Sequence, residues 1–181
     1  FIVDLGTGVD CRPSQLLGFD VIGDVFARLF WGVERPRVAL LSVGAEAGKG
    51  NRQVKETTEV LARSGLNFIG NVEATDLPAG PAEVVVCDGF VGNIVMKLTE
   101  ALGKATAELL ADRLRTALPA GELDSLVRQV YDVSNVVEVY GGGPLFGARG
   151  VSVVGHGRAT ADAIVKAITT AKRSVEMRLV S

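Results

Sequence analysis

The chain has 181 residues, enough for one domain of ordinary size, and its 48% hydrophobic and 22% charged residues are typical of a globular protein. A net charge of −2 argues against a nucleic-acid backbone as the partner. The mean hydropathy of +0.30 is high, yet no uninterrupted apolar run is long enough to span a membrane. We therefore expect the excess apolar surface in the core, against a partner subunit, or lightly against a bilayer.

The cysteines and the opening residues indicate the setting in which the protein works. Cys11 and Cys87 are far apart and have no metal-like spacing, which favours a reduced, cytoplasmic compartment. The chain opens on "FIVDLGTG", with no initiator Met and no charged leader. Because these residues have the pattern of a buried strand, we expect that an N-terminal part is missing.

The first half of the chain alternates apolar strand-like runs with helical patterns, which is typical of a mostly parallel α/β sheet. A strand over residues 1–5 precedes a helix that begins at Pro13 and Ser14. One face of this helix carries an apolar stripe of Leu17, Val21, Val25 and Leu29, with Ile22, Phe26 and Phe30 beside it. Strands are also predicted at 37–43, 66–72 and 82–88, and a helix at 53–63. Their near-continuous apolar runs suit strands that are covered on both faces.

The second half is mainly helical. A long helix is predicted over residues 93–118, with a break at 119–121. An amphipathic helix follows, with apolar residues at offsets of three and four: Leu123, Leu126, Val127, Val130 and Tyr131. We expect "YGGGPLFGARG" to be a loop, "VSVVG" to be a short strand, and 160–175 to be the last helix. The chain is then one catalytic α/β domain over 1–181, incomplete at its N-terminus, with 102–131 appended as a helical hairpin.

The segment "GAEAGKGN" has the glycines and lysine of a phosphate-binding loop. The spacing of a nucleotide-hydrolysing loop fails, because three residues separate Gly44 and Gly48 and Gly50 stands where a Ser or Thr would coordinate magnesium. An anion site of Gly48, Lys49, Gly50 and Asn51 at a helix N-terminus still fits. The alternative is a tight strand-to-helix turn with a solvated lysine, and spacing alone does not decide between them.

The segment "CDGFVGNIVMK" repeats this arrangement of strand, glycines and helix. It supplies Asp88, Gly89, Gly92 and Asn93, and Lys97 on the helix. Asp88 would lie at the carboxyl end of a strand, where ligands bind in open α/β sheets. The alternative is that Asp88 caps the turn or the helix, and Asn93 would serve equally well as the N-cap.

Two further glycine-rich segments complete the set. "GHGR" holds the single histidine, His156, between two glycines at a strand end, and Arg158 at a predicted helix start. His156 is favoured as a functional residue over a structural one, and Arg158 would pair with a phosphate or carboxylate or be solvated. "YGGGPLFG" offers only Tyr140 as a titratable group. Four such turns at strand ends are the arrangement of a phosphate-handling cleft.

Taken in order, six segments resemble a known family: "VDLGTGVDCRP", "GAEAGKGN", "LNFIGNVEATDL", "VVVCDGFVGNIVMKLTE", "YGGGPLFGARGV" and "VVGHGRATADAI". They are similar to the bacterial phosphate acyltransferase of phospholipid synthesis, the PlsX family. The resemblance implies a Rossmann-like α-β-α sandwich similar to the isocitrate/isopropylmalate-dehydrogenase-like fold. It also implies transfer of a fatty acyl group from acyl carrier protein to inorganic phosphate, without a cofactor or metal. The acyl phosphate product would feed the membrane acyltransferase that acylates glycerol 3-phosphate.

The resemblance suggests roles for the candidate residues. Lys49 and the amides of Gly48, Gly50 and Asn51 would cradle phosphate, with Gly89, Gly92 and Arg158 as further binding residues. Asn93 or backbone amides would stabilise the oxyanion. His156 would orient phosphate or protonate the leaving thiolate, and Asp88 would orient Lys97 or hydrogen-bond protonated phosphate. Hence His156, Asp88, Asn93 and Lys97 are the predicted catalytic residues.

Two departures from the family pattern concern the first segment and the length. Thr7 and Gly8 stand where the family usually has an Ala-Asn pair, and the family's opening glycine-rich block is absent. If that block lines the cleft, this fragment alone is inactive. Family members use the region of 102–131 for dimer contact and peripheral membrane attachment. Its mixed charges favour packing against the domain or a second subunit over an anionic bilayer.

Three other functions fit parts of the sequence. A phosphotransacetylase-like enzyme would perform the same reaction with acyl-CoA. A nicotinamide-dependent dehydrogenase ranks low, since no G-x-G-x-x-G follows a strand with an acidic residue at the expected distance. A non-catalytic module would hold phosphate or an acyl carrier without turnover.

Overall fold

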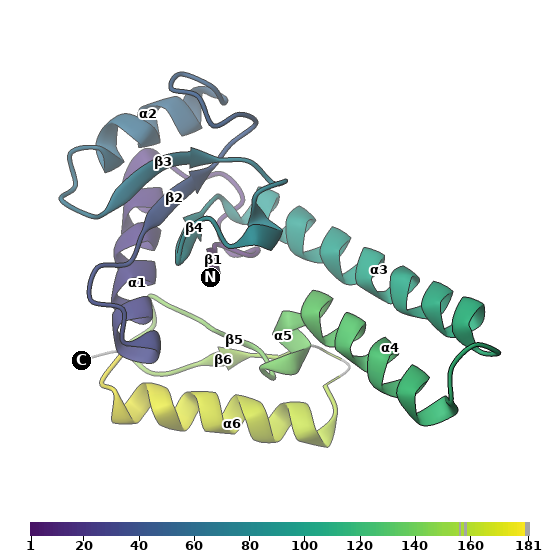
Figure 1. Cartoon of the computed structure of the whole chain (residues 1–181). Helices are drawn as coiled ribbons and strands as arrows, with labels where there is room; N and C mark the ends of the chain where they lie inside the picture. The colour runs from purple at the N-terminus through teal and green to yellow at the C-terminus, as the bar shows by residue number, and fades with distance from the viewer. Residues whose placement is uncertain (156, 158, 180–181) are drawn as a thin grey trace. The chain divides into compact units, whose positions relative to one another are not determined.

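The computed structural model describes residues 1–155, 157 and 159–179. The chain divides into two compact units, Phe1–Met96 and Lys97–Ser181. Each unit has its own sheet (Figure 1). The expectation of one catalytic domain over 1–181 stays a prediction.

The first unit is built on a four-stranded sheet in the order β1-β4-β2-β3, in which every neighbouring pair is parallel. This confirms the predicted α/β class and parallel sheet. The strands are β1 (Ile2–Val3), β2 (Val38–Leu41), β3 (Phe68–Val72) and β4 (Val84–Val86). The helices are α1 (Pro13–Trp31), α2 (Arg52–Leu61) and the 3-10 helix η1 (Leu77–Ala79).

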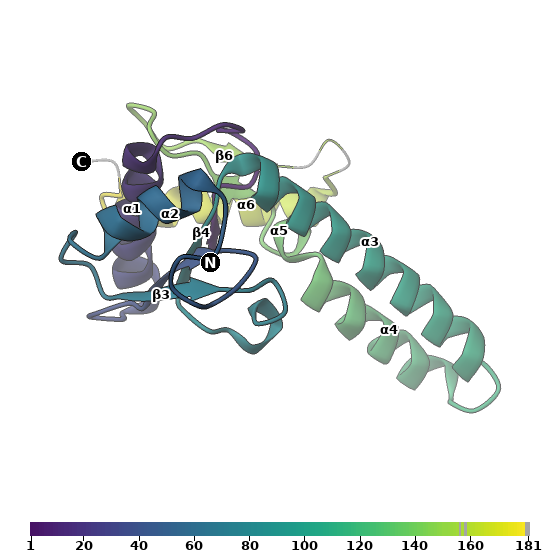
Figure 2. The same cartoon turned by 90° about the horizontal axis from the view of Figure 1, so that it is seen from above.

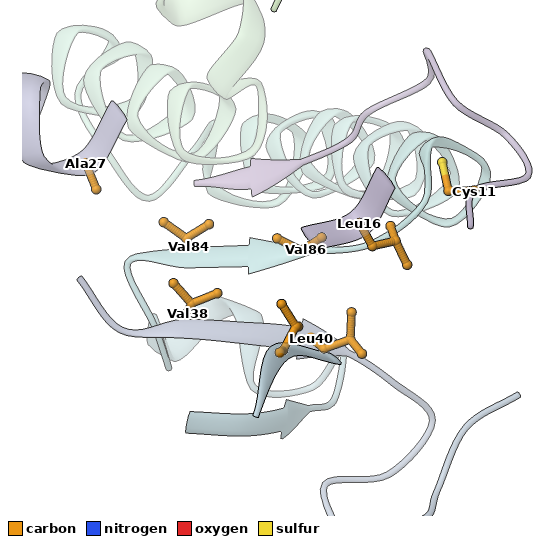
Figure 3. Packing of buried hydrophobic residues seen from close by; sticks show 8 residues of the cluster. Cys11, Leu16, Ala27, Val38, Leu40, Val84 and Val86 are labelled. Carbon is orange, nitrogen blue, oxygen red and sulfur yellow. The ribbon is translucent and has the colours of Figure 1, made fainter. Parts of the chain in front are cut away.

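The core of this unit lies on both faces of β2 and β4, whose residues are all buried. On one face, Val38 and Leu40 of β2 lie beside Val84 and Val86 of β4, with Leu16 of α1 against them (Figure 3). On the other face, residues of alternate register pack with η1 and the first turns of α3: Ala39, Leu41, Val85, Leu77 and Val95. The prediction that the strands are covered on both faces is confirmed for β2 and β4, whereas Ile69 of β3 is exposed.

The expected apolar face of α1 is covered only in part. Leu17 packs against the core and Phe26 is buried, whereas Val21, Val25 and Leu29 are exposed. The buried residues also include Asp20 and Gly23. An added Cβ at Gly23 would overlap the side chain of Val84, so a residue without a side chain lets the helix approach the sheet closely there.

The second unit begins within α3 (Gly89–Leu114), a single helix that starts four residues earlier and ends four earlier than expected. Its other elements are α4 (Ala120–Ser134), α5 (Val136–Val139), β5 (Gly143–Pro144), β6 (Val153–Val154) and α6 (Ala161–Glu176). β5 pairs antiparallel with β6, so the glycine-rich segment expected as a loop contributes a short strand. Glycine and proline have no strand periodicity, which is why the sequence pattern missed it.

The helices α3 and α4 lie side by side in both views (Figures 1 and 2). Gly103 of α3 lies against Ser134 of α4, where an added Cβ would overlap the Ser134 hydroxyl. That hydroxyl donates a hydrogen bond to the carbonyl oxygen of Val130 at 2.6 Å. A glycine at this contact therefore allows the two helices to approach closely. Among the described helices, none combines the length and apolar character that a membrane span requires.

Candidate functional site

The loops that follow the parallel strands lie along one edge of the sheet. β4 lies between β1 and β2, so the loops after these three strands are neighbours, since adjacent strands are roughly 4.8 Å apart. Asp4 follows β1, Asp88 follows β4, and residues 44–51 follow β2. The fold thus brings two of the four predicted glycine loops together. It adds the β1 loop, to which no site residue was assigned from the sequence.

The loop after β2 owes its shape to two glycines. Gly48 has φ +85° and Gly50 has φ +101°, values that strongly favour glycine. The backbone N–H of Lys49 donates to the carbonyl oxygen of Glu46 at 3.1 Å, which closes the turn. The Lys49 side chain is exposed, and no carboxylate in the described part of the chain forms an ion pair with it. The ammonium group is therefore available to an anion.

Asn51 has a structural task at the start of α2. Its Oδ1 accepts the backbone N–H of Val54 at 2.9 Å, which makes Asn51 the N-cap of the helix. The first helical N–H groups, those of Arg52 and Gln53, have no acceptor within the helix. Such amides, together with the helix dipole, attract anions. A phosphate at this loop would therefore meet backbone amides and Lys49, with Asn51 holding the helix start in place.

Ser42, which the sequence pattern did not single out, lies beside Gly50 of this loop. Its hydroxyl oxygen is buried and has no hydrogen-bond partner among the described residues. An added Cβ at Gly50 would come 3.1 Å from that oxygen and 2.5 Å from a methyl carbon of Val54. Gly50 is thus required by space as well as by its backbone angle. One serine in an apolar strand gives no sequence signal for such a position.

Asp88 caps α3. Its Oδ1 accepts the N–H of Val91 at 2.8 Å, and its carbonyl oxygen accepts the N–H of Gly92 at 3.0 Å. The alternative in which Asn93 caps the helix is wrong, because α3 already begins at Gly89. Either residue type is a good N-cap, so composition alone does not choose between them. Asn93 is exposed in the second turn of the helix.

The glycines at the start of α3 are explained by close packing against the β1 loop. The N–H of Gly89 donates to the carbonyl oxygen of Gly8 at 2.6 Å. An added Cβ at Gly89 would come 2.9 Å from three backbone atoms of the β1 loop, and one at Gly92 would overlap the carbonyl oxygen of Asp4. The role of Gly89 and Gly92 in binding phosphate stays a prediction, and their role in packing accounts for both.

The other predicted site residues are Lys97, His156 and Arg158. Lys97 forms an ion pair with Glu100 at 2.9 Å. It lies roughly 12 Å along the helix axis from Gly89, given a rise of about 1.5 Å per residue. His156 and Arg158 lie outside the described residues, so their predicted roles stay predictions.

The Asp4 carboxylate holds the β1 loop together through hydrogen bonds, and the sequence pattern did not single it out. Its Oδ1 accepts the N–H groups of Gly6 at 2.9 Å and Thr7 at 3.0 Å. Its Oδ2 accepts the N–H of Gly8 at 2.6 Å. One carboxylate thus fills a nest of three amides, an arrangement that elsewhere binds an external anion. The spacing D-x-G-x-G was the available signal.

Neither cysteine is suited to be a nucleophile. Burial raises the pKa of the Cys11 thiol, and the nearby carboxylates of Asp4 and Asp88 raise it further. Burial raises the pKa of Cys87 to about 12. The thiolate is the reactive form, and both groups are protonated at neutral pH. The two thiols serve as buried contacts, with Cys11 donating to the carbonyl oxygen of Gly8 at 3.3 Å.

The whole chain, residues 1–181, matches one protein-family model, which is described as "Fatty acid synthesis protein". The chain belongs to the fatty acid synthesis protein family. This confirms at family level the resemblance carried by the six sequence segments.

Curated relatives within the fatty acid synthesis protein family carry the name "Phosphate acyltransferase". The relative from Elusimicrobium minutum (strain Pei191) is 39% identical and the alignment covers 99% of this chain and 54% of that protein. The relative from Aquifex aeolicus (strain VF5) is 41% identical over 94% of this chain and 51% of its own length. The relative from Moorella thermoacetica is 41% identical over 99% and 54%. The chain spans about half the length of the curated relatives it matches.

In this member of the fatty acid synthesis protein family, the edge of the sheet has two parts of different charge. Asp4, Asp10 and Asp88 are close enough to Cys11 to raise its pKa, so the part after β1 and β4 is acidic. The part after β2 has Lys49 and the first amides of α2, together with Glu46 in the loop and Glu73, whose Oε1 accepts the N–H of Ala45 at 3.3 Å. Lys49 and these amides are the groups that an anion would meet on the β2 side. Within the described residues, no group of three or more His, Cys, Asp and Glu side chains is arranged to hold a metal ion.

Proposed function

We propose that the chain forms part of an acyltransferase that moves a fatty acyl group from acyl carrier protein to inorganic phosphate, for phospholipid synthesis. The observation that carries the proposal is the loop after β2, where Gly48 and Gly50 have positive φ beside Lys49 at the start of α2. The name phosphate acyltransferase, which relatives of the same family carry, supports the reaction class.

The reaction needs a site for a dianion beside a thioester carbonyl. A phosphate oxygen attacks the carbonyl carbon and forms a C–O bond, and the tetrahedral oxyanion collapses with cleavage of the C–S bond. The thiolate of the carrier leaves and takes up one proton, for which we propose His156 as the donor. Asn93 or a backbone amide would hold the oxyanion. Holding both reactants in place makes the bimolecular step effectively unimolecular, and this contributes much of the rate enhancement.

We place the phosphate at the start of α2 rather than at the start of α3. In α3 the N–H groups of Gly89, Val91 and Gly92 already donate to Gly8 or Asp88. Asp88 and Asp4 also repel a dianion at that position. At α2 Asn51 accepts the third helical N–H, and within the described part of the chain the N–H groups of Arg52 and Gln53 have no acceptor. The acyl thioester would then lie toward α3, beside Asn93.

Replacing Lys49 by alanine is expected to raise the KM for phosphate roughly 10- to 100-fold, the effect of losing one charge-assisted hydrogen bond. The KM for the acyl donor at saturating phosphate should change less than twofold. Lys55→Ala is the matched control, because Lys55 on α2 is exposed like Lys49 and its substitution removes the same charge. Initial rates at varied phosphate measure both constants. An increase confined to the acyl donor would contradict the phosphate site.

The reaction itself is tested by the transfer of labelled inorganic phosphate into acyl phosphate. The assay compares long-chain acyl carrier protein with acyl-CoA, using this chain and the full-length gene product in parallel. Label transferred from the carrier protein alone is the expected result. Transfer from acyl-CoA would favour the phosphotransacetylase-like alternative. Saturable phosphate binding without transfer by the full-length protein would instead mean a binding module.

The finer architecture and the partners belong to the same proposal. We propose the Rossmann-like sandwich of the isocitrate/isopropylmalate-dehydrogenase-like fold, with residues 102–131 as an appended helical hairpin. The protein would be a cytoplasmic homodimer with peripheral membrane contact near the downstream membrane acyltransferase. Exposed leucines on α3 support a subunit contact: Leu98, Leu102 and Leu109. Such exposed apolar positions on one helix are typical of a surface that a partner covers.

Leu102→Glu is expected to convert a dimer to a monomer in light scattering of the full-length protein, because burying a carboxylate at an apolar contact is strongly unfavourable. Lys104→Glu is the control, because Lys104 is two residues after Leu102 and therefore lies on nearly the opposite side of the helix. A molar mass unchanged by Leu102→Glu would contradict the contact. If the wild type is monomeric and floats with anionic vesicles, the bilayer covers these leucines instead.

A further inference from the structure

The contacts of Asp4 extend from the end of β1 to the start of α3. The carboxylate accepts the N–H groups of Gly6, Thr7 and Gly8. The carbonyl oxygen of Gly8 then accepts the N–H of Gly89 at 2.6 Å. Because the nest ends at Gly8, the carboxylate sets the position of the atom that receives the first amide of α3.

The same loop is in close contact with two more positions of α3. The carbonyl oxygen of Asp4 leaves no room for a side chain at Gly92. An added Cβ at Gly6 would come 3.7 Å from Oδ1 of Asn93, so the loop borders the amide group of that side chain. Gly6 has φ +143°, a conformation that side chains rarely adopt. In this conformation, which the Asp4 carboxylate stabilises, the loop borders Asn93.

We propose that Asp4 is a positioning residue, which holds the Gly6–Gly8 loop against α3 and thereby sets where Asn93 meets the acyl group. This inference rests on the proposed function. Both oxygens of Asp4 accept backbone amides, which assigns this carboxylate to holding the loop and not to binding substrate. It acts on the acyl side of the site, whereas Lys49 acts on the phosphate side.

Asp4→Asn separates these roles. An amide group has one acceptor oxygen, so at least one of the three N–H groups then faces an NH2 donor. We expect kcat, counted per phosphate-binding site in the full-length protein, to fall on the order of 10- to 100-fold, as for a small misplacement of a reacting group. The KM and the binding stoichiometry for inorganic phosphate should stay within twofold of the wild type.

Asp10→Asn is the matched control. Asp10 belongs to the same loop and carries the same charge, is exposed, and makes no hydrogen bond or ion pair with another described residue. Its kcat should equal that of the wild type. Amide hydrogen exchange gives a readout without turnover: protection at Gly8 and Gly89 should fall in Asp4→Asn, while protection at Leu40 and Val85 in the core is kept.

The outcomes are distinct. A merely structural role predicts that phosphate stoichiometry and core protection fall together with kcat, and that result would overturn the inference. An unchanged kcat per site in Asp4→Asn would also overturn it. A full-length wild type that makes no acyl phosphate contradicts the proposed function and the catalytic part of this inference with it. Loss of exchange protection at Gly89 in Asp4→Asn would even then show that Asp4 holds the loop on α3.

Discussion

Gly92→Ala is expected to destabilise the protein by about 3 kcal/mol or more, because overpacking against a rigid backbone cannot be relieved by rotating a side chain. The added Cβ would overlap the carbonyl oxygen of Asp4 and come 3.0 Å from the Cys87 sulfur. The β1 loop and the start of α3 would have to separate. Urea unfolding followed by circular dichroism measures the change. We expect the midpoint urea concentration to fall strongly, or the variant to be insoluble.

Gly18→Ala is the control for this substitution. Gly18 lies inside α1, and no atom lies within 4 Å of an added Cβ. Alanine there should stabilise the helix by about 0.5–1 kcal/mol, since it lowers the conformational entropy of the unfolded chain. If Gly92→Ala were as well tolerated as Gly18→Ala, the close contact between α3 and the β1 loop would be refuted.

Asp20→Asn is expected to stabilise the protein at neutral pH and to remove a pH dependence. Asp20 is fully buried on α1, and neither carboxylate oxygen has a hydrogen-bond partner among the described residues. Burial raises its pKa to about 8. Ionising such a group without a partner is unfavourable, so the folded protein keeps it protonated at neutral pH.

The direction of the effect follows from proton binding. Below the ordinary pKa of 3.8 the carboxyl is protonated in both the folded and the unfolded state, and it gives no penalty. As pH rises toward 8, only the unfolded chain releases the proton. The free energy of unfolding therefore falls by about 1.4 kcal/mol per pH unit, and by on the order of 4 kcal/mol at pH 7. Above pH 8 both states are ionised and the fall stops.

Denaturant titrations from pH 4 to 9 compare the wild type with Asp20→Asn. The difference in unfolding free energy should be smallest at pH 4 and grow as pH rises. Asp24→Asn is the contrasting control, because Asp24 is buried beside Arg28, with Oδ2 to Nε at 2.8 Å. Losing the ion pair between Asp24 and the half-exposed Arg28 should lower the free energy of unfolding by about 1 kcal/mol. Parallel curves for Asp20→Asn and the wild type would show that Asp20 has a partner.

The sheet was predictable from the sequence for a physical reason. Runs such as Val84–Val86 are apolar at every position, and this pattern occurs where both faces of a strand are covered. The covered face of α1 was predictable only in part, since Leu17 and Phe26 pack as expected and Val21, Val25 and Leu29 do not. It depends on Gly23, which lets the helix approach Val84, and no hydropathy pattern contains the distance between two elements.

The shape of the candidate site was predictable in part. Glycines after an apolar strand predicted a tight loop, and Gly48 and Gly50 have positive φ. This geometry suits both an anion loop and a plain turn, so phosphate binding there stays a prediction. This loop lies next to Asp88 because β2 and β4 are adjacent in the sheet, and that strand order is a property of the whole sheet. Asp4 was not found, because its only sequence signal, the spacing D-x-G-x-G, does not by itself distinguish a carboxylate that folds its own loop from a solvated one.

The pairing of β1 with β4 also bears on how the protein is made. Val3 is in register with Val86, so β1 finds this neighbour only after β4 has been synthesised. Contacts between residues so far apart form slowly, because a long loop must close first. Since the Asp4 nest contacts Gly89 and Gly92, we expect its docking on α3 to be late in folding. During translation this edge of β4 is then exposed to other chains until β1 joins it.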